Sequence, residues 1–210
     1  MTYELIELGI VYDGIKNAYP DISVPPPLPE REDSPYKRYR KSYTPLIRNV
    51  VGNNAVYLWF SHHKEGNLEY IYVGETHINK QGLKGRFKDE FRRWHHGFWA
   101  STFHTEKYLP EAIRIYSNVE KYKPKKGYAG DIETNFSKRG ATYLVYCTNV
   151  PVEYDVIVIQ NDLIQLFENP RGNEKDKRVV PLPEEQLLPI SKIIHKTFIE
   201  IASNTRPHII

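Results

Sequence analysis

Two neighbouring apolar runs of the chain each carry a tyrosine. The run 55–60 reads AVYLWF and contains Tyr57, and the run 69–74 reads EYIYVG and contains Tyr72. A tyrosine joins an apolar ring to a hydroxyl that donates and accepts hydrogen bonds, which suits active sites and wet interfaces. We interpret both runs as strands, and the sixteen tyrosines of the chain as an unusual excess.

Alternation along the two strands predicts which side chains share a face. A hairpin loop through Gly66–Asn67 would make the strands antiparallel neighbours and could place Tyr57 close to Tyr72. The same alternation predicts that Tyr70 shares the face of Tyr72. Gly74 ends the second run, where we expect a close backbone approach or a positive φ angle.

Charged residues follow on a segment with helical periodicity, 83–95. At about 100° per residue, Arg86 and Arg93 lie together beside the apolar stripe, and Glu90 falls almost inside it. A carboxylate so placed needs a partner, which both arginines can supply. We therefore interpret Glu90 chiefly as the group that neutralises them. The stripe consists of Leu83, Phe87, Phe91 and Trp94.

A second predicted helix, 154–168, has one polar residue within its apolar face. Gln160 lies beside Val156 and Ile164 on the helical wheel, where an inward-pointing functional group would be expected. The run TYLVYCTNV at 142–150 predicts a third strand before this helix.

The remaining segments predict additions to a central core at 47–175. Residues 1–46 form an N-terminal arm and linker, and the proline cluster predicts an extended arm over 21–46. The basic and aromatic segment 96–140 is a long insertion. Residues 176–210 form a C-terminal extension with an amphipathic helix, whose apolar face serves either internal packing or, as we slightly favour, a dimer contact.

Composition sets wider limits. The net charge of +3 is only mildly basic and favours a nucleic-acid partner weakly. Cys147 is the only cysteine, so no intramolecular disulfide can form, and a reducing cytoplasm fits best. The N-terminus predicts no signal peptide, and no run approaches the roughly 18 apolar residues of a membrane span.

The order of these segments resembles the GIY-YIG nuclease superfamily over roughly residues 50–175. The resemblance implies an α/β (α+β) fold, with a small mixed sheet flanked by helices. The matching motifs are Ala55-Val56-Tyr57 (with alanine in place of the usual glycine), Tyr72-Val73-Gly74, Leu83-Lys84-Gly85-Arg86, and QNDLIQLFENPRGN ending at Asn173.

The resemblance implies hydrolysis of DNA phosphodiester bonds with one divalent ion, Mg²⁺ or Mn²⁺. Tyr57 would orient or activate water, Tyr72 would assist it, and Arg86 would clamp the phosphate. The basic segment 36–43 is either a DNA-backbone contact or a solvated linker. To DNA we assign Lys37, Arg38, Arg40, Lys41, Lys80, Lys84, Arg93 and Asn173.

The main departure from the family pattern is Gln160, which stands where the family has its metal-binding glutamate. A neutral amide would hold Mg²⁺ poorly. The chain has therefore lost cleavage by substitution, introduced or natural, or else another acid such as Glu90 or Asp162 serves as the ligand. We favour inactivation by substitution.

The length of 210 residues favours, within this superfamily, an enzyme like the type II restriction endonucleases of restriction-modification systems. Such an enzyme would act on double-stranded DNA as a homodimer, since a palindromic site is met by two-fold symmetry. The alternatives are a non-cleaving DNA-binding or regulatory protein on the same core, and a tyrosine-rich α/β interaction domain.

Overall fold

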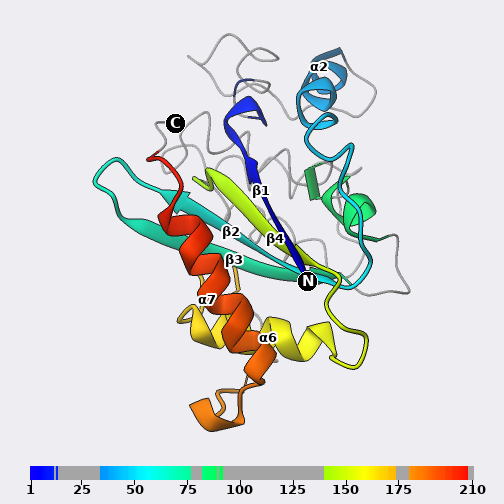
Figure 1. Ribbon diagram of the computed structural model, residues 1–210. Coiled ribbons are helices and arrows are strands. Elements are labelled where there is room, and N and C mark those ends of the chain that lie inside the picture. Colours follow the sequence, from blue (N-terminus) through cyan, green and yellow to red (C-terminus); the bar gives the residue numbers. More distant parts are fainter. Residues whose placement is uncertain are drawn as a thin grey trace, which may run out of the picture.

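The computed structural model contains a four-stranded sheet with helices on both faces (Figure 1). The strand order is β1-β4-β2-β3. The strands are β1 (Thr2–Glu7), β2 (Ala55–His62), β3 (Leu68–Thr76) and β4 (Tyr143–Thr148). The structure describes residues 1–11, 13, 34–76, 82–88, 90–91, 140–173 and 180–207.

The α+β class predicted from the sequence is confirmed. All the described strand pairs are antiparallel, however, so the sheet is not mixed in strand direction. A hydrophobic pattern marks a strand without fixing its direction, and the long connection between β3 and β4 allows either one. Within the described residues, no helix is long and apolar enough to cross a bilayer.

The N-terminal segment is part of the core rather than a separate arm. Strand β1 pairs with β4 from Thr2 opposite Thr148 to Glu7 opposite Tyr143. Helix α2 (Ser34–Tyr43) replaces the extended conformation that we expected there. A proline in the first helical turn, here Pro35, is compatible with a helix, because the amide that it lacks would have no intrahelical partner.

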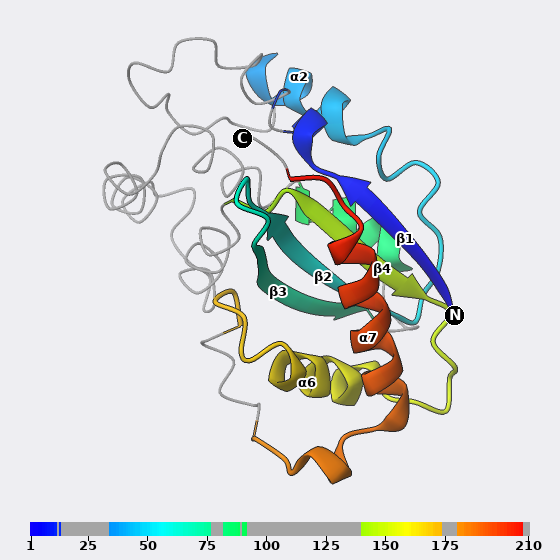
Figure 2. The same ribbon diagram turned by 60° about the vertical axis from the view of Figure 1, so that its left-hand side comes forward.

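Helices α6 (Val156–Leu166) and α7 (Pro189–Ser203) cover one face of the sheet (Figure 2). The Asp155 side chain caps α6 by accepting a 2.8 Å hydrogen bond from the backbone nitrogen of Ile157. A short 3₁₀ helix, Glu184–Gln186, precedes α7. The apolar face of α7 is buried against the sheet and α6, so it does not supply the dimer contact that we favoured. Its buried residues include Ile190, Ile194 and Phe198.

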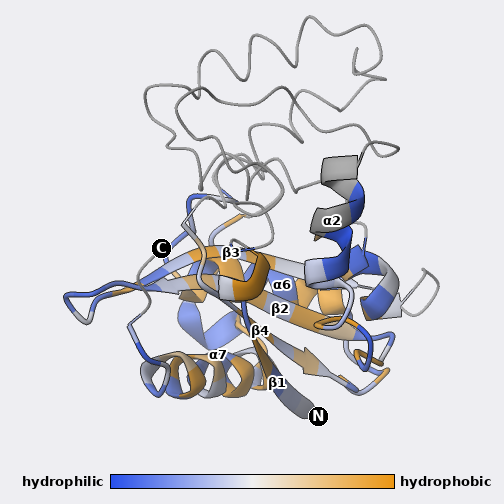
Figure 3. Ribbon diagram, turned by 90° about the horizontal axis from the view of Figure 1, so that it is seen from above, coloured by the Kyte–Doolittle hydropathy of each residue, from blue (hydrophilic) through white to orange (hydrophobic). Residues whose placement is uncertain are grey.

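The opposite face packs against helical residues 82–88 and 90–91 and against the end of α2. Figure 3 shows hydrophobic residues concentrated in the central strands, whereas the described part of α2 is mainly hydrophilic. Tyr57 and Trp59 of β2 belong to this cluster, and their neighbours Val56 and Leu58 belong to the α6–α7 cluster. The predicted alternation along β2 is therefore confirmed.

A β-bulge changes the predicted pattern in β3. Trp59 pairs with Tyr72 but Phe60 pairs with Tyr70, so Ile71 has no partner in the register. The extra residue rotates the strand and places Tyr70 on the α6–α7 face, where its ring lies 4.6 Å from that of Phe167. Our prediction that Tyr70 shares a face with Tyr72 is wrong for this reason.

Candidate active site

Tyr57 crosses the edge strand because Gly74 leaves room for it. The two residues are directly opposite in the β2–β3 ladder, and Tyr57 is fully buried. A Cβ atom at Gly74 would overlap the Tyr57 ring. Gly74 is therefore needed for close approach and not for a positive φ angle, which settles the choice that the sequence left open.

The Tyr57 hydroxyl lies between a carboxylate and a guanidinium group on the neighbouring helix. It donates a hydrogen bond to Oε1 of Glu90 at 2.5 Å and accepts one from Nε of Arg86 at 3.0 Å. Nε of Arg86 lies 3.1 Å from the same Glu90 oxygen. These three side chains form a closed, hydrogen-bonded triangle between β2 and the helix.

The triangle fixes Arg86 by one edge of its guanidinium group. Nε faces inward to Tyr57 and Glu90, and these neighbours raise the pKa of Arg86 further, although burial opposes them. The side chain is 38% exposed. Its two terminal nitrogens have no hydrogen-bond partner in the part of the chain that the structure describes, and terminal guanidinium nitrogens are suited to binding a phosphate or carboxylate in bidentate fashion.

Glu90 is almost completely buried, with 1% exposure. Its Oε2 atom is buried and has no hydrogen-bond partner among the described residues. Burial raises the pKa of Tyr57 well above its usual value, although Arg86 opposes that shift. Tyr57 consequently keeps its proton, and this proton forms the hydrogen bond to Glu90. Sequence reasoning noticed Glu90 but connected it only to the arginines.

Tyr72 borders this triangle. The ring centroids of Tyr57 and Tyr72 are 6.3 Å apart and the rings are tilted by 44°. The proximity predicted from the hairpin is therefore confirmed.

Gln160 reaches the edge of the sheet from the opposite face. Its Nε2 atom donates to the Val73 carbonyl at 3.1 Å, one residue before Gly74. Tyr57 and Gln160 thus approach adjacent residues of β3 from two sides. Within the described residues, no hydrogen bond joins Gln160 to the Tyr57–Arg86–Glu90 triangle.

Asn173 seals the same edge. Its Oδ1 accepts from the Val73 nitrogen at 2.8 Å and its Nδ2 donates to the Val73 carbonyl at 3.0 Å. The neighbouring Gly172 nitrogen donates to the Ile71 carbonyl at 2.8 Å. Because Asn173 is buried and binds the backbone, we assign it a structural role in place of the expected DNA contact.

The residues present do not fit a magnesium ion. No three His, Cys, Asp or Glu side chains come together in the described ranges. Gln160 offers one neutral amide oxygen, whereas Mg²⁺ is usually bound through carboxylates. Asp162, the alternative ligand, faces α7, where its Oδ2 accepts from the Leu188 nitrogen at 3.0 Å and the Ser191 hydroxyl at 2.7 Å.

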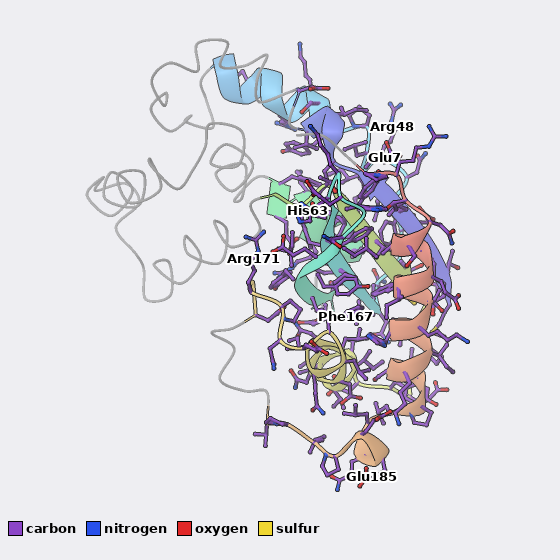
Figure 4. All side chains as sticks on the ribbon, turned by 90° about the vertical axis from the view of Figure 1, so that its left-hand side faces the viewer. Glu7, Arg48, His63, Phe167, Arg171 and Glu185 are labelled. Carbon is purple, nitrogen blue, oxygen red and sulfur yellow. The ribbon has the colours of Figure 1, made fainter. Side chains whose placement is uncertain are left out.

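A basic groove lies beside α2, with a volume of about 560 Å³. Lys84 connects it to the helix that carries Arg86, because its Nζ donates to the Arg48 carbonyl at 2.6 Å. Arg48 lies at the α2 end of the molecule, far from Glu185 (Figure 4). Sequence reasoning missed Arg48 because it follows the basic run after a turn. The groove is lined by Lys37, Arg40, Lys41, Thr44, Pro45 and Arg48.

Three of the predicted DNA contacts cannot be placed. Lys80, Arg93 and the side chain of Arg38 lie outside the described residues, as do residues 96–139 of the predicted insertion 96–140. The structure therefore brings together Tyr57, Tyr72 and Arg86, and adds Glu90.

Comparisons of the chain with models of protein families, with curated proteins and with solved structures find no match. The triangle of Tyr57, Arg86 and Glu90, and the groove beside α2, are accordingly the observations on which a function can be argued.

Proposed function

We propose that the chain is a site-specific DNA endonuclease of the GIY-YIG kind, which hydrolyses phosphodiester bonds. One observation carries this proposal: the Tyr57 hydroxyl is held between Arg86 and Glu90, next to the glycine that admits it. A buried phenol fixed by a cation and an anion is preorganised, and preorganised donors stabilise charge that develops during a reaction.

The proposed chemistry uses the hydrogen-bonding positions of the triangle that have no partner among the described residues. The terminal nitrogens of Arg86 would bind two oxygens of a DNA phosphate. The Tyr57 oxygen has a second lone pair, which would accept a hydrogen bond from the attacking water. Tyr72 lies beside Tyr57, and its hydroxyl would assist in orienting that water.

The groove beside α2 supports a duplex partner. Among the described residues, four cationic side chains line it, Lys37, Arg40, Lys41 and Arg48, all of them exposed, and no acidic side chain does. Such a surface suits a DNA backbone, whose phosphates would release bound counterions on contact. The link from Arg48 to Lys84 continues the groove toward the helix of Arg86.

Two further features of the proposal concern assembly and location. One site cuts one strand, so a double-strand cut at a palindromic target would require two copies related by a two-fold axis.

We place the protein in the cytoplasm because its single cysteine is a buried free thiol. Burial raises the pKa of Cys147 to about 11, which keeps that thiol protonated.

Gln160 limits the proposed activity. Without a carboxylate at this position the described residues offer no fitting Mg²⁺ site, so we expect the chain to bind DNA and to cut it poorly. The same observation favours a second candidate, a DNA-binding or regulatory protein that does not cleave.

Plasmid cleavage with Mg²⁺ tests the choice, using the chain with Gln160 and the variant Gln160→Glu. A glutamate cannot donate to the Val73 carbonyl, which retains Asn173 as a partner, so the new carboxylate would be free to bind the metal. We expect cleavage to rise by about 10²-fold or more, the scale of one electrostatic group in a site.

Gln165→Glu is the matched control, because it adds the same charge to the same helix while its side chain lies at the Leu182 backbone. It should leave cleavage unchanged. DNA binding without cleavage by Gln160→Glu would favour the non-cleaving candidate, and absence of DNA binding by both proteins would exclude both candidates.

A further inference from the structure

The hydroxyl of Tyr57 has a defined set of hydrogen-bonding positions. A phenol has one proton to donate and two lone pairs that accept. The proton points to Oε1 of Glu90, and one lone pair receives Nε–H of Arg86. Among the described residues nothing donates to the other lone pair, so a further hydrogen bond would be accepted there.

The contacts of Glu90 go beyond neutralising a cation. Its oxygen lies 2.5 Å from the Tyr57 hydroxyl and 3.1 Å from Nε of Arg86, so the phenol is the closer partner. The second carboxylate oxygen is buried and has no partner in the described part of the chain. A group that only neutralised Arg86 would not need to enter the core as far as Tyr57.

We propose that Glu90 is the proton acceptor of the site, acting through Tyr57. This inference rests on the proposed function. As the water oxygen attacks phosphorus, a water proton passes to the Tyr57 oxygen, and the Tyr57 proton passes to Oε1 of Glu90. The bond from phosphorus to the leaving sugar oxygen breaks, and that oxygen takes a proton from solvent water.

This relay leaves Tyr57 neutral before and after the step. Glu90 begins as a carboxylate and ends as a carboxylic acid, while the negative charge passes to the leaving sugar oxygen and, once that oxygen is protonated by water, to hydroxide. Tyr57 acting alone would have to become a buried phenolate, and its burial disfavours that form. The relay avoids the phenolate, and it gives Glu90 a role that helical spacing alone does not predict. Glu90 would thus be a positioning and proton-accepting residue that does not touch the substrate.

Two substitutions separate this role from neutralisation of Arg86. Both are made in the Gln160→Glu background, or in the chain with Gln160 if that chain already cuts. Glu90→Gln keeps the side-chain shape but removes the negative charge. Glu90→Asp keeps the charge near Arg86 but withdraws the carboxylate from Tyr57 by one methylene group. Single-turnover cleavage of a duplex target and the Kd for that duplex are measured for each variant, with thermal unfolding to verify the fold.

We expect both variants to lower the single-turnover rate by about 10²-fold or more, which is the usual contribution of a general base. The Kd should not rise in either variant. In Glu90→Gln it should fall, because Arg86 is no longer neutralised. A loss of rate without loss of affinity is the result that a merely structural role would not produce.

Four results would count against the proposal. Full cleavage by Glu90→Asp would reduce Glu90 to a neutraliser of Arg86. Parallel losses of rate and affinity in both variants would make it a structural residue. If the Gln160→Glu parent and the chain with Gln160 both fail to cut, the proposed nuclease function fails, and the relay fails with it. If the parent cuts and both Glu90 variants cut equally well, the relay alone is wrong.

Discussion

Two carboxylates are buried on opposite faces of one sheet, and their surroundings differ in kind. Asp162, on the α6 face, is 3% exposed and accepts hydrogen bonds from the Leu188 backbone and the Ser191 hydroxyl. Glu90, on the other face, is 1% exposed and meets a phenol and a guanidinium, with one oxygen left without a partner in the described chain.

The difference shows that burial of a charge does not by itself indicate function. Asp162 fixes the start of α7 with neutral donors, which is the ordinary way to satisfy a buried carboxylate. Glu90 has partners that can exchange a proton or bind an anion. A structural acid and a functional acid therefore differ in the kind of partner they have, and in whether a carboxylate oxygen is left without a hydrogen bond.

The largest expected effect is a difference in the free energy of unfolding between variants of the two buried acids. Asp162→Ala would leave the Leu188 nitrogen and the Ser191 hydroxyl buried without an acceptor, at a cost of about 2–4 kcal/mol in the free energy of unfolding. Glu90→Gln should cost less than about 1 kcal/mol, because it relieves a partly unsatisfied buried charge. Urea denaturation measures both, and equal losses would remove the distinction between the two acids.

The second effect tests whether Gly74 serves the Tyr57 triangle. Gly74→Ala places a methyl group against the Tyr57 ring and should destabilise the fold by about 1–3 kcal/mol. In the double variant Gly74→Ala with Tyr57→Val the overlap is gone, and the loss from the methyl group should disappear in a double-mutant cycle. Additive losses would show that the glycine is needed for another reason.

The third effect is the contribution of Tyr57 to the pH dependence of stability. The pKa of Tyr57 is raised in the folded state above the value of about 10 that an unfolded tyrosine has. Above pH 10 the unfolded chain therefore loses this proton while the folded chain keeps it, so stability is full below pH 10 and falls as pH rises.

Tyr57→Phe removes that contribution, and the free energy of unfolding should then fall less steeply above pH 10, by up to about 1.4 kcal/mol per pH unit. Tyr3, whose pKa is raised to about 12, and Cys147 remain in both proteins and set a common background. Identical slopes in a denaturation series from pH 8 to 11 would contradict the burial of an un-ionised Tyr57.

The smallest effect compares basic residues on the two faces. Lys41→Ala with Arg48→Ala removes two cations of the groove, and the slope of log K against log[salt] for duplex binding should fall by about 1.8. Lys192→Ala with Lys196→Ala removes two cations from α7 and should leave the slope unchanged. Equal changes in the two double variants would mean that the groove has no special role in DNA binding.

Local patterns explain how much of the site could be predicted. Alternation in β2 and the hairpin connection place Tyr57 near Tyr72, because both rules act over a few residues. Alternation does not reveal the bulge at Ile71, so the face of Tyr70, whose ring packs against Phe167, could not be predicted. Strand β1 finds a partner about 140 residues away, which no periodicity indicates.

The role of Glu90 shows the same limit at the site itself. Helical spacing connects it to Arg86, four residues before, and that pair is present. Its closer partner, Tyr57, lies on another element 33 residues earlier, and only the fold brings the two together. The position of Gln160 in the helix was predictable, whereas its contact with the Val73 carbonyl was not.

The most direct test of the site is single-turnover cleavage of a duplex target by Gln160→Glu with and without Tyr57→Phe, each with its Kd. Phenylalanine keeps the ring over Gly74 and removes only the hydroxyl that Arg86 and Glu90 hold. We predict a rate lower by about 10²-fold or more with the Kd within a few-fold. Equal rates for the two proteins would contradict the account, because the Tyr57 hydroxyl would then have no part in the chemistry.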